Sequence, residues 1–72
     1  MDIHEVIDIV NRVSYALMED PLTKDAKVDV VNERGVVTLQ GTVDREEIRQ
    51  AAEEIARKQN GVLTVINELK VL

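Results

Sequence analysis

The side chains that could take part in catalysis or metal binding are few and far apart in this chain. His4 is the only histidine and cysteine is absent, so a zinc site would rest on one imidazole and carboxylates. Ser14 falls on the predicted buried face of a helix and has no plausible base to activate it. No glycine loop of the phosphate-binding kind is present. The residues therefore predict a protein that is not an enzyme and that holds no metal or cofactor.

The charge balance narrows the possible partners. The chain has 9 basic and 14 acidic residues, which give a net charge of -5 and a pI near 4.7. Nucleic acids bind proteins largely through basic side chains on the phosphates, so we expect no nucleic-acid partner. The same argument weakens attachment to an anionic bilayer without excluding it.

A polar stripe on the first predicted helix is the first candidate site. It consists of His4, Asp8, Asn11, Arg12 and Tyr15. Tyr15 is the only aromatic residue of the chain, and its amphipathic ring suits a membrane interface. Two interpretations stay open: a solvated helix face, or a surface that contacts phospholipid headgroups or a protein partner.

A second group of oxygen-bearing side chains follows this helix: Asp20, Asp25, Asp29 and Asn32. Such oxygens could bind a hard cation, but their spacing is not that of a calcium loop. Ordinary turn chemistry is the interpretation that the pattern favours.

Hydrophobic periodicity predicts the elements that position these residues, all within one domain covering residues 1–72. Asp2 and Glu5 form a capping box, so a helix begins at Ile3, and Pro21 ends it with Asp20 starting the exit loop. Residues 27–31 ("KVDVV") alternate as a strand, and a second strand lies in 34–43 ("RGVVTLQGTV"). The turn "NERG", residues 32–35, makes the two strands a hairpin.

A second helix and a third strand complete the pattern. Asp44 and Glu47 repeat the capping box, and the helix carries the ion pairs Glu53 with Arg57 and Glu54 with Lys58. The dipeptide "NG" at 60–61 stops the helix, and "VLTVINELKVL", residues 62–72, follows as a strand. Its inner face is formed by Leu63, Val65, Asn67, Leu69 and Val71.

Four residues are expected to have structural roles: three glycines that allow particular backbone conformations or close contacts, and an asparagine that forms hydrogen bonds inside the domain. Gly35 takes positive φ in the hairpin turn and Gly61 in the helix stop. Gly41 interrupts the inner face of its strand, which indicates a bulge or the close approach of a helix backbone. Asn67 faces inward and needs hydrogen-bond partners if it is buried.

The fold class that follows is α+β: a two-layer α-β-β-α-β sandwich whose three-stranded sheet has both helices on one face. The strand order stays open, because the third strand can lie parallel beside the second or antiparallel beside the first. The uncovered sheet face is the second candidate site, with Val36, Thr38, Val62, Thr64 and Ile66 joined by Val31 and Thr42. We expect a protein-protein or self-association surface there, or scattered exposed β-branched residues.

The sequence shows no signal peptide and no apolar run that could span a membrane, so a chain that starts natively at Met1 is expected to be cytoplasmic. The stretches "GVVTLQGTV" at 35–43 and "GVLTVINELKV" at 61–71 resemble the BON domain, the bacterial OsmY and nodulation module. The stretch "AL..DP" at 16–21, "V.V" at 28–30 and the alanines at 52 and 56 extend the resemblance over nearly the whole chain.

The resemblance implies the same fold and a non-enzymatic binding module. The function it implies first is attachment to phospholipid or to a component of the cell envelope. Association through the open sheet face is the main alternative, and the resemblance also implies cytosolic potassium binding as a third possibility.

Overall fold

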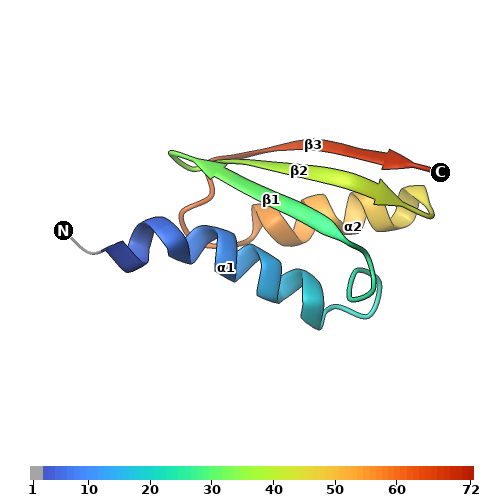
Figure 1. The fold of residues 1–72 in the computed structure, drawn as a ribbon, viewed down its shortest axis with the longest axis horizontal. Helices are drawn as coiled ribbons and strands as arrows, with labels where there is room; N and C mark the ends of the chain where they lie inside the picture. The colour runs from blue at the N-terminus through green and yellow to red at the C-terminus, as the bar shows by residue number, and fades with distance from the viewer. Residues whose placement is uncertain (1–2) are drawn as a thin grey trace.

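The computed structural model describes residues 3–72, with side chains from residue 9 onward. It contains α1 (Ile3–Glu19), β1 (Val28–Glu33), β2 (Val36–Val43), α2 (Glu46–Arg57) and β3 (Thr64–Val71). This is the predicted order of elements (Figure 1). The capping box predicted at Asp2 and Glu5 lies outside the described side chains.

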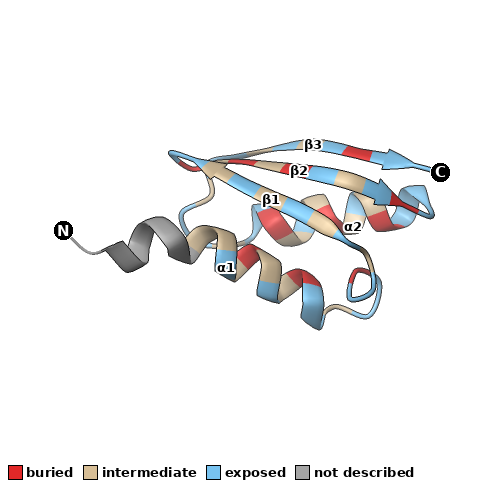
Figure 2. Ribbon diagram, in the orientation of Figure 1, coloured by how far each residue is buried: buried red, intermediate tan, exposed pale blue. Residues whose placement is uncertain are grey.

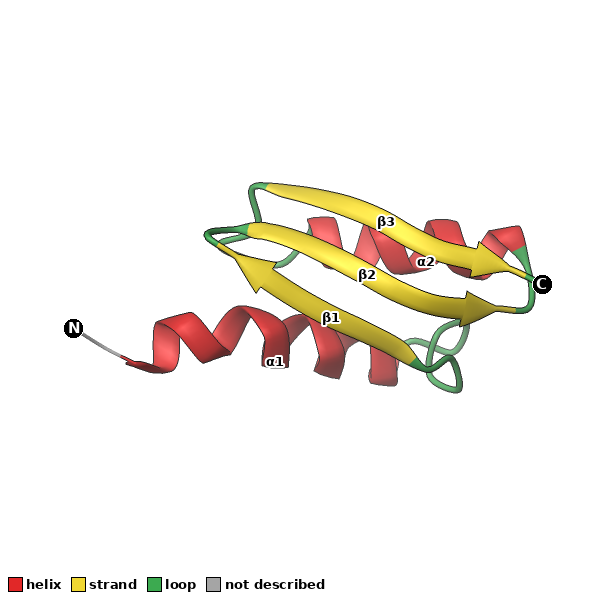
Figure 3. Cartoon of the chain, turned by 45° about the horizontal axis from the view of Figure 1, so that its top comes forward, coloured by secondary structure: helices red, strands yellow, loops and turns green. Residues whose placement is uncertain are grey.

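The sheet has the order β1-β2-β3, so β2 is the central strand (Figure 3). β1 pairs with β2 antiparallel, and β3 pairs with β2 parallel. This settles the strand order that the sequence left open, since α2 is the crossover that brings β3 back in the direction of β2. Both helices lie on the same face of the sheet, α1 against β1 and α2 against β2 and β3, as predicted.

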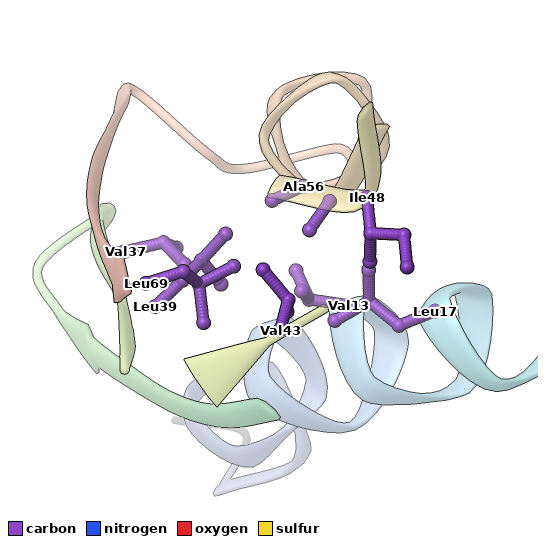
Figure 4. Close-up of a cluster of buried hydrophobic side chains, with 9 residues drawn as sticks. Val13, Leu17, Val37, Leu39, Val43, Ile48, Ala56 and Leu69 are labelled. Atoms are coloured by element: carbon purple, nitrogen blue, oxygen red, sulfur yellow. The ribbon is translucent and has the colours of Figure 1, made fainter. Parts of the chain in front are cut away.

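The core fills the space between the two layers (Figure 4). It takes two residues from α1, three each from β2 and α2, and one from β3: Val13, Leu17, Val37, Leu39, Val43, Ile48, Ala52, Ala56 and Leu69. The two alanines allow the α2 backbone to approach the sheet closely. No aromatic side chain is part of this core, so its stability rests on aliphatic packing.

The end of α1 agrees with the stop predicted at Pro21. The helix ends at Glu19, and the Asp20 carboxylate accepts a hydrogen bond from the Leu22 amide at 2.9 Å. Thr23 is buried, and its hydroxyl donates to the Leu17 carbonyl at 2.6 Å. This side chain satisfies one of the carbonyls that the helix end leaves without an intrahelical partner.

The hairpin turn is shorter than predicted. β1 continues to Glu33, and only Arg34 and Gly35 remain between the strands, with φ of 55° and 89°. Both residues take the left-handed conformation that a two-residue hairpin needs. The Asn32 side chain stabilises the turn by accepting a hydrogen bond from the Gly35 amide at 2.9 Å.

Gly41 is required for a different reason from either predicted one. The pairing of β1 with β2 is regular from Glu33–Val36 to Val28–Gly41, which is its last pair. A Cβ on Gly41, whose φ is 133°, would lie 2.7 Å from the Lys27 carbonyl oxygen. The backbone that approaches closely is therefore that of Lys27, directly before β1, and not a helix.

The capping box predicted for α2 is wrong. The helix begins at Glu46, and its N-cap is Arg45, which is extended and makes no side-chain cap. The acidic residues of the first turn form ion pairs instead, Glu46 with Arg49 at 2.6 Å and Glu47 with Arg45 at 3.4 Å. The predicted pair of Glu53 with Arg57 is present.

The start of β3 also differs from the prediction. Leu63, expected on the inner face, is 80% exposed, whereas Val62, expected on the open face, packs against the core. The Val62 amide donates to the Gln59 carbonyl in a turn, and regular alternation begins only at Thr64. The predicted strand includes two residues that belong to a turn, where side chains do not alternate between the faces of a sheet. The predicted faces of Val62 and Leu63 are therefore reversed.

Candidate functional site

Two large apolar side chains are exposed on the part of α1 from residue 9 onward. Tyr15 is 63% exposed and Met18 is 68% exposed, and Asn11 lies one turn before Tyr15 on the same side of the helix. With Arg12 and Ser14, both half-buried, they line a shallow depression. We call Asn11, Tyr15 and Met18 the α1 outer surface. Figure 2 shows that α1 alternates between exposed and more buried positions along its described part.

Met18 is not part of the stripe predicted from the sequence, because methionine is as typical of a core as of a contact surface. Its spacing of three residues from Tyr15 is the signal that could have found it, since residues 11, 15 and 18 share one side of a helix. Leu22, which is 41% exposed, lies in the loop after the end of α1. His4 and Asp8, also predicted for this stripe, lie outside the described side chains.

Arg12 faces the loop between α2 and β3. Its guanidinium donates a hydrogen bond to the Asn60 carbonyl at 2.9 Å. The cation predicted for the outer stripe is thus also a link between α1 and a loop 48 residues away.

Tyr15 is neutral at physiological pH. Hydrogen bonding with the carboxylate of Glu19, one turn further along α1, raises the pKa of Tyr15, and the negative charge of Glu19 raises it further. The phenol therefore presents an uncharged ring with a polar tip, which is the character that favours a membrane interface.

The open sheet face is the second surface, and strand pairing arranges it in rows. Val31, Thr38 and Ile66 form one row across the three strands, and Val31 and Ile66 are 49% and 45% exposed. Val36 and Thr64 form the next row toward the hairpin. Four of the five predicted residues are thus brought together, and Val62 is the one that is not.

The other end of the open sheet face is polar. The Gln40 amide donates to the Glu68 carboxylate at 3.0 Å, and these two residues are paired in register. Thr42 and Lys70 form the next row, and the bare backbone of Gly41 leaves a hollow between the two rows. The apolar part of the face is therefore limited to the half near the hairpin.

Asn67 has the hydrogen-bond partners that its inward position required. Its side-chain amide donates to the Arg49 carbonyl at 2.9 Å and to the Glu53 carboxylate at 3.2 Å. Its side-chain oxygen accepts a hydrogen bond from the Leu69 amide at 3.1 Å. Asn67 thus ties β3 to α2, and this confirms the prediction that it would be paired.

Comparison with protein families gives a match over residues 6–72 to the BON domain. The match covers nearly all of the chain: α2, all three strands and α1 except for its first three residues. The chain belongs to the BON domain family. A search of the curated proteins found no match.

BON domains are small modules associated with membrane and phospholipid binding, and they are generally non-catalytic. No enzyme family matched this BON domain. Within residues 3–72, no helix is long and apolar enough to cross a bilayer.

Two of the four polar residues predicted after α1, Asp20 and Asn32, stabilise turns in this BON domain. The side chains of Asp20 and Asn32 accept hydrogen bonds from the backbone amides of Leu22 and Gly35. Among the side chains from residue 9 onward, no three histidine, aspartate or glutamate residues are grouped as metal ligands would be. These contacts support the interpretation as turn chemistry.

Proposed function

We propose that this BON domain is a non-catalytic module that attaches to a phospholipid surface through the α1 outer surface. The observation that carries the proposal is the exposure of Tyr15 and Met18, at 63% and 68%, on one side of a helix. Tyrosine rings are enriched at the boundary between headgroups and acyl chains, and the flexible methionine side chain adapts to irregular apolar surfaces. Membership of a family associated with phospholipid binding supports the same surface chemistry.

The contact is apolar and not electrostatic. The net charge of -5 repels an anionic bilayer. Arg12, which lines the depression beside the α1 outer surface, donates a hydrogen bond to the Asn60 carbonyl. Attraction between basic side chains and anionic lipid, about 1 kcal/mol per residue, is therefore largely missing. Anionic lipid should not be required for binding.

Attachment through two side chains is weak. Full burial of a large apolar side chain contributes about 1.5 to 3 kcal/mol, so Tyr15 and Met18 together give at most about 3 to 6 kcal/mol. A dissociation constant of about 1 mM corresponds to roughly 4 kcal/mol. We therefore expect an affinity near the millimolar range for a single copy.

A variant pair tests this proposal by co-sedimentation with phosphatidylcholine vesicles. The double substitution Tyr15→Ala and Met18→Ala should reduce the bound fraction by at least about tenfold, which corresponds to a loss of about 1.4 kcal/mol. The control is Val31→Ala with Ile66→Ala, which removes exposed apolar atoms from the open sheet face instead. Equal binding by both double variants would contradict the proposed surface.

The open sheet face supports a second candidate function, association with a protein partner or with a second copy. The observation that favours it is the row of Val31, Thr38 and Ile66 across all three strands. The strands have six, eight and eight residues, so the face spans at most about 14 by 26 Å, or roughly 370 Å². Stable interfaces bury about 800 Å² on each partner, so this face alone supports only weak association.

A further inference from the structure

β3 has one free edge. It pairs with β2 on one side, and within residues 3–72 no strand lies on its other side (Figure 3). Unpaired amides and carbonyls along such an edge are a template for pairing with another chain, and folded proteins commonly block them. The residues along β3 show how this edge is blocked.

The amides that face the free edge can be identified from the pairing. The Thr64 amide donates to the Gly35 carbonyl at 3.3 Å, and the Leu72 amide donates to the Val43 carbonyl at 2.9 Å. Even-numbered amides of β3 therefore point toward β2. Because the direction alternates along a strand, the amides of residues 65, 67, 69 and 71 point toward the free edge.

The Asn67 side chain binds one of these four edge amides, that of Leu69. Its side-chain oxygen accepts the hydrogen bond of the Leu69 amide at 3.1 Å. The same side chain is held in place by α2, since it donates to the Arg49 carbonyl at 2.9 Å and to the Glu53 carboxylate at 3.2 Å. The amide of Leu69 is thereby unavailable to an incoming strand.

We propose that Asn67 closes the free edge of β3 against strand pairing with a second copy of this chain. The second copy is the partner that fits, because β3 is complementary to itself when two copies run antiparallel about Leu69. In that register Glu68 of each copy lies opposite Lys70 of the other, and Ile66 lies opposite Leu72. Opposite charges facing each other across two strands stabilise the pair.

This register needs the amide that Asn67 occupies. At its centre the two Leu69 residues face each other, and each Leu69 amide would donate to the Leu69 carbonyl of the other copy. Ile66 and Leu72 are 45% and 83% exposed, so the apolar pair of the same register is also available on the surface. Removal of the Asn67 oxygen should therefore expose a pairing edge.

Two matched substitutions separate this role from simple loss of stability. Asn67→Val removes both the acceptor for the Leu69 amide and the donors to α2, whereas Asn67→Asp removes the donors and keeps an acceptor. Both are made together with Glu53→Gln, so that no carboxylate opposes the new aspartate. By sedimentation velocity, the valine variant should form dimers at concentrations where the aspartate variant and the Glu53→Gln parent are monomers.

A third substitution tests the register. Adding Lys70→Glu to the valine variant places two carboxylates opposite each other on both sides of Leu69, so this variant should return to a monomer. A valine variant that stays monomeric would overturn the proposal, and so would an aspartate variant that dimerises equally. Dimers that persist with Lys70→Glu would overturn the register about Leu69.

The unsubstituted protein offers an independent measurement that does not depend on any variant folding. Amide hydrogen exchange should be slower at Leu69 than at Val65 and Val71, which face the same edge. A hydrogen bond of about 1 kcal/mol corresponds to roughly fivefold slower exchange. Exchange at Leu69 as fast as at those two residues would contradict the blocked edge.

Discussion

At the scale of single residues, the contact between Gly41 and the start of β1 constrains the sheet most tightly. The φ of 133° at Gly41 lies in the region that side chains rarely adopt, and a Cβ there would lie 2.7 Å from the Lys27 carbonyl oxygen. That carbonyl belongs to the backbone directly before Val28, the residue that pairs with Gly41. The neighbour cannot move without breaking the register.

Gly41→Ala should therefore lower the free energy of unfolding by about 2 kcal/mol or more, from backbone strain and the clash together. Urea unfolding followed by circular dichroism measures this loss. Thr42→Ala is the control, because Thr42 is exposed in the next position and its replacement should change stability by no more than about 0.5 kcal/mol. Similar losses for the two variants would show that Gly41 is not constrained in this way.

The residues of the candidate site could be predicted only in part. Tyr15 was found because it is the only aromatic side chain and lies at helical spacing from Asn11. Met18 lies on the same side of α1, but methionine fits a core as readily as a surface, so its type alone gave no signal. The bond from Arg12 to Asn60 joins residues 48 apart in the chain, and no local pattern indicates such a contact.

At the scale of the elements, α1 is held to the rest of the domain by packing and by a long-range polar contact of Arg12. Val13 and Leu17 pack into the core, and Arg12 donates to the Asn60 carbonyl in the loop between α2 and β3. Six β-branched apolar residues between Ile3 and Val13 give α1 low intrinsic helix propensity, so these tertiary contacts must stabilise it.

Arg12→Met should lower the free energy of unfolding by at least about 1 kcal/mol, because the apolar part of the side chain is kept and the hydrogen bond to the Asn60 carbonyl is lost. The amide signals of Asn60 and Gly61 should shift in the folded variant, which NMR can detect. Lys24→Met is the control, since Lys24 is an exposed cation in the loop after α1. Unchanged stability and unchanged loop signals would contradict the link.

The element order and the inner faces of the strands were predictable because periods of two and of about 3.6 were both clear in the sequence. The errors lie where those periods stop. A turn at residues 59–62 places Val62 toward the core and Leu63 in solvent, the reverse of the prediction. At the start of α2 the predicted Asp44 cap does not form, and Glu46 pairs with Arg49. The strand order needed the pairing itself, because two arrangements satisfied the same pattern.

At the scale of the whole molecule, the two candidate surfaces lie on opposite sides of the domain. The open sheet face looks away from both helices, and the α1 outer surface lies on the helical layer (Figures 1 and 2). The overall charge of -5 acts on both surfaces and disfavours any strongly anionic partner. A partner that binds one surface should therefore leave the signals of the other surface unchanged.

The most direct test is an amide chemical-shift titration of the isotope-labelled protein with phosphatidylcholine bicelles, repeated with bicelles that also contain phosphatidylglycerol. We predict shifts at and around Tyr15 and Met18 with the uncharged lipid, and no tighter binding when the anionic lipid is added. Shifts confined to the rows of Val31, Thr38 and Ile66, or no shifts with either lipid, would contradict attachment through α1.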